Sequence, residues 1–134
     1  ELSEERLIRG CLAEGLKYVV SQRLVPKAGG GRLAALEILK NTIRTRELIH
    51  SGEDADNTFS EILEQSATYG MQTFDTHLAR LFEQGEIDEQ MAMLHGSDKS
   101  KLGQMVDRIK SERGEKVTNI ENLELDLDYE KRGQ

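Results

Sequence analysis

Three glycines in a row lie between two apolar runs in the stretch VPKAGGGRLAALEIL, residues 25–39. Glycine-rich loops often bind phosphate, because their N–H groups and the start of a following helix hold the anion. A P-loop of this kind also needs a lysine and a hydroxyl residue directly after its last glycine. Here Gly31 is followed by Arg32 and Leu33, and the next residues have the pattern of a strand. We therefore predict the turn of a β-hairpin at these glycines and no nucleotide site.

The histidines and the single cysteine form no recognisable catalytic or metal site. His50, His77 and His95 are scattered, without the two histidines four residues apart that a zinc-binding helix requires. Asp75 and His77 are two residues apart on a predicted helix, so their side chains do not face each other. Cys11 shares the apolar face of a predicted helix, which indicates a core position rather than a nucleophile. We predict no catalytic, cofactor-binding or metal-binding residues in this chain.

Composition and charge argue against a membrane-inserted protein and against a nucleic-acid-binding protein. The chain has 134 residues, of which 37% are hydrophobic and only 4% aromatic, so a single core must be built mainly from aliphatic side chains. We expect no membrane insertion, because no apolar run approaches the roughly 20 residues that span a bilayer. One cysteine without a partner suggests a cytoplasmic location. The net charge of −7 argues against nucleic acid as a partner.

The spacing of apolar residues predicts an α+β fold with one β-hairpin and about five or six α-helices. Strands are expected at residues 16–25 and 32–39, on either side of the glycines. A first helix is expected to start at Ser3 and stop at Gly15. Further helices are expected from Thr42 to His50, over residues 59–69, from residue 72 or 73 to 84, after residue 88, and after residue 98.

We divide the chain into a helix, hairpin and short helix at residues 1–52, a helical region at 53–113 and an acidic tail at 114–134. In the tail, Leu123, Leu125, Leu127 and Tyr129 alternate with acidic and amide residues. This pattern is compatible with a solvated acidic tail, and also with an edge strand or a segment that docks a partner. Because the chain begins with Glu1 inside a helix signal, we expect it to be a piece of a longer protein.

Three stretches resemble the C-terminal region of PilT-like motor ATPases, which belong to the secretion ATPase superfamily and drive type IV pilus retraction. They are GLKYVVSQRLVPKAGGGRLAALEIL, NTIRTRELIHSGE and YGMQTFDTHLARLFEQGEI, in this order within residues 12–87. In such proteins the Walker A, acidic, Walker B and histidine boxes all precede the strand that resembles residues 18–25. The resemblance thus implies that ATP and Mg are bound by the parent protein, and that this chain is inactive alone.

PilT-like motors carry a helix motif, A-I-R-N-L-I-R-E, that is associated with coupling of hydrolysis to retraction. It falls on residues 44–51, where Arg46, Leu48 and Ile49 match and the other positions differ. These differences leave a PilU-like accessory motor, or a pilus assembly or type II secretion ATPase, as alternatives. The forked guanidinium of Arg46 suits a carboxylate across an interface, whereas Leu48 and Ile49 suit packing against the helix around residues 59–63.

A second family motif follows near residue 70. Met71, Gln72, Thr73 and Asp75 match it, so the resemblance implies that they contribute to coupling or to subunit contacts. Capping of a helix start explains Thr73 or Asp75 equally well. The implied partners are neighbouring subunits of a hexamer and an inner-membrane pilus platform protein, with the parent in the cytoplasm against that membrane. A stand-alone interaction module, with residues 121–130 binding a basic partner, is the alternative function.

Overall fold

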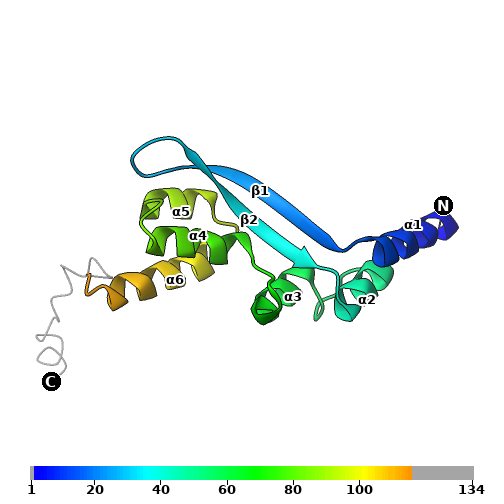
Figure 1. Ribbon diagram of the computed structural model, residues 1–134. Helices are drawn as coiled ribbons and strands as arrows, with labels where there is room; N and C mark the ends of the chain where they lie inside the picture. The colour runs from blue at the N-terminus through cyan, green and yellow to red at the C-terminus, as the bar shows by residue number, and fades with distance from the viewer. Residues whose placement is uncertain (1, 116–134) are drawn as a thin grey trace, which may run out of the picture.

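The computed structural model describes residues 2–115, and the alternating Leu123–Tyr129 segment lies outside them. Figure 1 shows one long hairpin with helices gathered along one side of it. Its strands are β1 (Tyr18–Pro26) and β2 (Arg32–Lys40), preceded by α1 (Leu2–Gly15). After β2 come α2 (Ile43–Ser51), α3 (Phe59–Gln65), a 3-10 turn (Ala67–Tyr69), α4 (Phe74–Glu83), α5 (Glu89–His95) and α6 (Lys99–Glu112). The prediction of an α+β fold with one hairpin and about five or six α-helices is confirmed, because the described residues contain one hairpin and six α-helices.

The hairpin turn is built from glycine backbone conformations. Gly29, Gly30 and Gly31 all have positive φ, between 80° and 106°, which costs any residue with a Cβ. Lys27 donates its N–H to the carbonyl of Gly31 at 3.0 Å, closing the loop between two antiparallel strands. The loop therefore leads into a strand and not into a helix N-terminus, in agreement with the predicted hairpin turn.

The two faces of the hairpin have different surroundings. Directly paired residues share a face, and Val25 and Ala35 lie fully buried on the face toward the helices. On the opposite face, Tyr18, Val20 and Leu24 are 53–59% exposed. One face of the sheet is thus packed and the other is open, as an antiparallel sheet allows.

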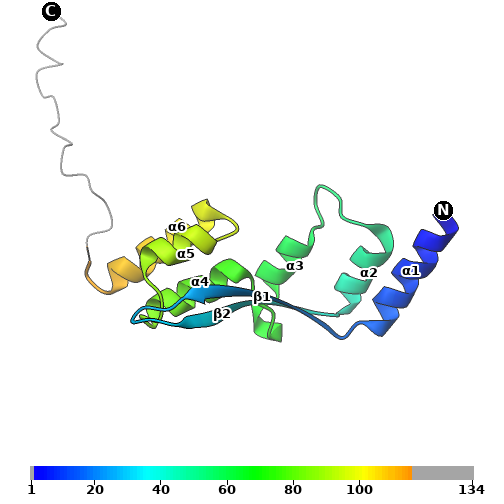
Figure 2. The same cartoon turned by 90° about the horizontal axis from the view of Figure 1, so that it is seen from above.

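Two hydrophobic clusters lie on the packed face of the hairpin. The larger lies near the turn and combines Val25 and Ala35 with apolar side chains of α4 and α6, such as Leu78 and Leu102. The smaller lies near the open end and contains Leu48, Ile62, Leu63 and Met71, with Leu39 and Phe59 packed against it. Figure 2 shows the corresponding division, with α1, α2 and α3 at one end of the hairpin and α4, α5 and α6 at the other.

The start of α1 and its apolar face depart from the sequence prediction. Ser3 lies inside the first turn of α1, which begins at Leu2, and is not its cap. Leu7, Ile8 and Leu12 are 46–68% exposed, and Cys11 is also exposed, so the predicted core position of this cysteine is wrong. Only small Ala13 is fully buried, because α1 has helix α2 as its one substantial neighbour among the described elements.

The outer edge of β2 is covered by hydrogen bonds from the segment that leads into α4. Gln72 and Ile38 exchange two main-chain bonds of 2.9 and 3.1 Å, and the Gln72 side chain donates to the carbonyl of Leu36 at 3.0 Å. The N–H of Leu36 donates to Nδ1 of His77 at 2.8 Å. This bond requires a neutral imidazole, and burial together with the nearby Arg80 guanidinium lowers the pKa of His77.

Replacing Gly30 by alanine tests the turn. A Cβ in this left-handed conformation costs about 1–2 kcal/mol, so Gly30→Ala should lower the free energy of unfolding by about that amount in a urea titration. Gly15→Ala is the matched control, because its φ is not positive and no atom lies within 4 Å of the added Cβ. Equal stability of the two variants contradicts the turn geometry.

Acidification tests the bond between His77 and Leu36. Because the folded state favours the neutral imidazole, the unfolded chain takes up the proton first, and this contribution to stability falls as pH drops below about 6.5. His77→Asn keeps an acceptor near the Nδ1 position without titrating, so its stability should depend less on pH between 7 and 5. His77→Leu leaves the N–H unpaired and should cost about 1–3 kcal/mol at pH 7. Parallel pH curves for the wild type and His77→Asn are inconsistent with this role.

Candidate coupling site

The first motif of the candidate site lies on α2, whose start is fixed by two threonines. Thr42 caps the helix by accepting the N–H of Thr45 at 3.3 Å, as predicted. Thr45 is 1% exposed and donates its hydroxyl to the carbonyl of Lys40 at 3.1 Å. A threonine can make this bond and an isoleucine cannot, so the end of β2 and the first turn of α2 are tied together by Thr45.

Leu48 and Met71 connect the two motifs. Both are buried, at 4% and 2% exposure, in the cluster that includes Ile62 and Leu63 of α3. The packing of Leu48 against α3 agrees with the sequence prediction. Met71 was placed by resemblance alone, and the structure brings it into the same core although it lies 23 residues from Leu48 in sequence.

Arg46 and Ile49 lie at the sides of α2. Ile49 is half-buried and lines an apolar cavity of about 110 Å³, together with Phe59 of α3. Its carbonyl accepts a hydrogen bond of 3.0 Å from Arg9 of α1. Arg46 is also half-buried, and its Nε is shielded from solvent without a hydrogen-bond partner among residues 2–115. A buried donor of this kind is costly unless an acceptor reaches it.

Gln72 and Thr73 place the start of α4 against the edge of β2. Gln72 bridges to Ile38 and Leu36, as described above, and Thr73 is the N-cap of α4. The hydroxyl of Thr73 accepts the N–H of Thr76 at 3.1 Å. Of the two caps considered from the sequence, Thr73 is therefore the cap, and Asp75 is available for other contacts.

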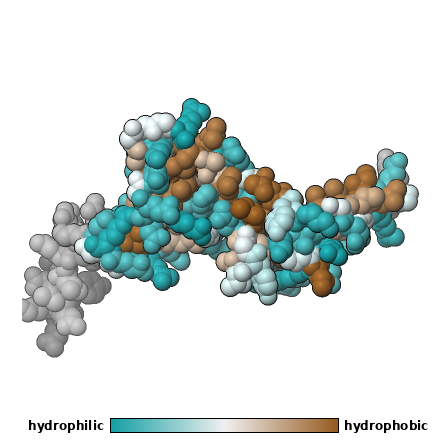
Figure 3. All heavy atoms as spheres, in the orientation of Figure 1, coloured by the Kyte–Doolittle hydropathy of each residue, from teal (hydrophilic) through white to brown (hydrophobic). Residues whose placement is uncertain are grey.

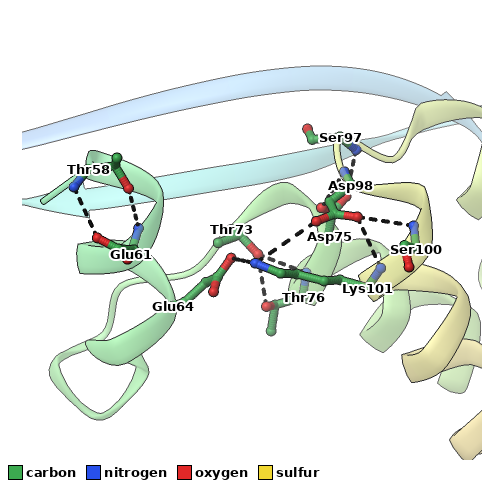
Figure 4. Close-up of polar contacts among 10 residues, drawn as sticks. All are labelled: Thr58, Glu61, Glu64, Thr73, Asp75, Thr76, Ser97, Asp98, Ser100 and Lys101. Atoms are coloured by element: carbon green, nitrogen blue, oxygen red, sulfur yellow. Dashed lines mark hydrogen bonds and ion pairs between the residues drawn. The ribbon is translucent and has the colours of Figure 1, made fainter. Parts of the chain in front are cut away.

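Asp75 holds the turn between α5 and α6. Its carboxylate is 7% exposed, and its two oxygens accept the N–H groups of Ser97 at 2.7 Å and Asp98 at 2.9 Å (Figure 4). Asp98 then caps α6 by accepting the N–H groups of Ser100 and Lys101. Asp75 thus transmits the position of α4 to the first turn of α6, and two amide donors compensate its burial.

Next to Asp75, a cavity of about 410 Å³ that is lined mostly by polar and charged residues lies between α4 and α6. Lys101 forms an ion pair of 2.7 Å with Glu64 of α3 across it (Figure 4). The hydrogen bond and charge of Glu64 raise the pKa of Lys101, which remains a cation at neutral pH. The pair links α6 to α3, the helix whose Ile62 and Leu63 pack in the same cluster as Leu48 and Met71.

Sequence reasoning missed several residues that hold this arrangement. Asn41 donates to the carbonyls of Ala13 and Leu16 at 2.7 Å each, which ties the end of α1 to the end of β2. Arg23 lies over the ring of Phe74 at 3.9 Å and donates to the carbonyl of His95. All these partners are at least 25 residues apart in sequence, so no local spacing signals them.

Within the described part of the chain, no three or more His, Cys, Asp or Glu side chains gather as a metal site would require. None of the described helices is both long and apolar enough to cross a membrane.

The sequence is similar to those of type IV pilus motor ATPases, although no family model matches it. The chain is 38% identical over 96 residues to the type IV pilus ATPase PilU of Pseudomonas aeruginosa, and 38% identical over 89 residues to PilT of that organism, whose name describes a type IV pilus retraction ATPase. A twitching motility protein of Neisseria gonorrhoeae is 36% identical over 90 residues. The matches cover 66–71% of this chain and about a quarter of each relative.

Solved structures agree with the sequence matches. A crystal structure of the pilus retraction motor PilT with bound ADP matches 78% of this chain at 31% identity and a TM-score of 0.60, covering 28% of that motor. The Yersinia pseudotuberculosis ATPase DotB matches the same share at 26% identity and a TM-score of 0.53. Sequence and fold together show that this chain is similar to one region of PilT-like secretion ATPases.

Proposed function

We propose that this chain is the C-terminal, non-catalytic part of a hexameric ATPase that powers type IV pilus retraction and twitching motility. Its contribution is subunit packing and the coupling of ATP hydrolysis to movement. The parent binds ATP and Mg and acts in the cytoplasm on an inner-membrane platform protein. The retraction branch is favoured because PilT matches with a higher TM-score than DotB, at 0.60 against 0.53. The second candidate is the same region of a secretion ATPase, because the structure of the ATPase DotB also matches this chain.

The observation that carries the proposal is the continuous contact path from α2 to α6. Leu48 and Met71 share one core, Gln72 binds the edge of β2, and Asp75 binds the turn before α6. We therefore expect a shift of α2 to displace the segment 71–75, because a close-packed core transmits displacement. Arg46 is the residue on α2 that faces a neighbouring subunit in this proposal, with its fork paired to a carboxylate there.

Substitution of Arg46 in the complete motor tests coupling. Arg46→Ala should leave ATP hydrolysis in place while twitching is lost, because an interface charge without its partner costs about 2–5 kcal/mol. Arg46→Lys retains the charge without the fork and should restore twitching only in part. The measurement is ATP turnover by the purified hexamer beside twitching zones of the same strain. Normal twitching of the alanine variant contradicts the role of Arg46.

The isolated chain gives a separate test of the non-catalytic assignment. We expect no ATP hydrolysis by residues 1–134 alone. Turnover that disappears in Gly30→Ala or Arg32→Ala would place a nucleotide site at the hairpin turn and refute the assignment.

A further inference from the structure

Arg23 is the one charged residue of β1, and its side chain is turned to the face of the hairpin that carries the helices. Its partner in the register is Ala35, which is fully buried on that face. Arg23 itself is half-buried, and Figure 3 shows hydrophobic residues gathered over the hairpin in this view. A charge in such surroundings is costly unless it is hydrogen-bonded.

The guanidinium of Arg23 contacts three residues outside the hairpin. Its Nη1 donates to the carbonyl of His95 at 2.7 Å and to the hydroxyl of Ser97 at 3.1 Å. Its Cζ lies 3.9 Å from the centroid of the Phe74 ring. His95 is the last residue of α5, and Phe74 is the first residue of α4. A planar guanidinium can stack on a ring and donate from its edge at the same time, a combination that lysine does not reproduce.

The α5–α6 turn (residues 95–98) is held by Asp75 of α4 as well as by Arg23. The two meet at Ser97, whose hydroxyl accepts from Arg23 and whose N–H donates to Asp75 at 2.7 Å (Figure 4). The other oxygen of Asp75 accepts the N–H of Asp98, which caps α6. The turn before α6 is therefore bound to β1 and to α4 through two groups of a single residue.

The turn lies tightly against α4 and α6. A Cβ at Gly96 would lie 2.5 Å from Cδ2 of Leu102 and 3.3 Å from Oδ1 of Asp75. Leu102 is fully buried in α6. Because the backbone of the turn is in direct contact with both helices, we expect a displacement of the turn to displace the first turn of α6.

We propose that Arg23 is a positioning residue that ties β1 directly to the α5–α6 turn and so helps to set the position of α6. This connection passes through neither α2 nor Met71, so it is a second route from the hairpin to α6 beside the path described above. The tie itself is independent of the proposed motor function. Its role in coupling rests on that function.

Hydrogen exchange of the full chain tests the tie. In Arg23→Ala we expect the amides of residues 97–102 to exchange at least about tenfold faster, because the turn loses two hydrogen bonds from a charged group. Amides of α2 and α3 should keep their wild-type rates, because these helices pack in the other cluster. Arg23→Lys should give intermediate rates. Gln22→Ala is the matched control, since Gln22 is the exposed neighbour in the strand, and it should match the wild type.

Unchanged exchange at residues 97–102 in Arg23→Ala overturns the proposal. An equal acceleration in every helix also overturns it, because Arg23 would then stabilise the whole fold without positioning the turn. If Arg23→Ala does not fold, Ser97→Ala decides the question, because it removes only the hydroxyl and keeps the N–H that binds Asp75. We expect about threefold faster exchange of the same amides in Ser97→Ala, whereas wild-type rates overturn the tie.

The complete motor tests the role in coupling, with Arg46→Ala measured beside Arg23→Ala. We expect Arg23→Ala to retain ATP turnover and to lose twitching, and Arg23→Lys to restore twitching in part. Normal twitching of Arg23→Ala beside loss in Arg46→Ala overturns the coupling role of Arg23 and leaves the proposed function intact. Normal twitching of both variants contradicts the proposed function as well.

Discussion

The main constraint on this structure is that a two-stranded hairpin is not stable alone, so helices must cover one of its faces. Such a hairpin in water is marginal unless one of its faces is covered. Here the covered face carries two separate hydrophobic clusters, one toward the turn and one toward the open end. The hairpin therefore acts as a common platform, and helices that are distant in sequence are placed relative to one another by the strand they share. β2 is the central element, because it packs against helices with one face and is hydrogen-bonded along both edges.

The segment between residues 71 and 75 joins the two clusters. Met71 belongs to the cluster of α2 and α3, and Phe74 belongs to the cluster of α4 and α6, with Gln72 fixed to β2 between them. The backbone of this segment has little conformational freedom, because its successive residues contact different elements. Asp75 extends the constraint to α6 through its buried carboxylate. A carboxylate in this position orients a turn by accepting two amides, which an apolar residue of the same size cannot do.

Most elements of this fold are evident from the sequence because they depend on local signals. Thr42, Thr73 and Asp88 cap helices by bonds to residues three positions on, and the glycines at the turn adopt the conformations that their lack of a Cβ permits. The links between elements were not predictable in this way. His77 gives no sign of its bond to Leu36, 41 residues earlier, and Asn41 gives none of its bonds to α1. The predicted helix at α1 is present, but the predicted core position of Cys11 on it was wrong, because periodicity shows which face of a helix is apolar and not whether another element covers that face.

Some elements bury the apolar residues that their sequence pattern places on one face, and others leave these residues exposed. In α4, the apolar residues Phe74, Leu78, Leu81 and Phe82 are all buried, and in α6 Leu102 and Val106 are buried while Met105 and Ile109 are partly buried. In α1 and on the open face of β1, the apolar residues Leu7, Ile8, Leu12, Val20 and Leu24 are exposed. Consistency between local pattern and final environment is a mark of a self-sufficient unit. The half of the molecule around α4 and α6 meets that criterion through its own contacts. The surface along α1 and β1 does not, because its apolar side chains remain exposed within residues 2–115.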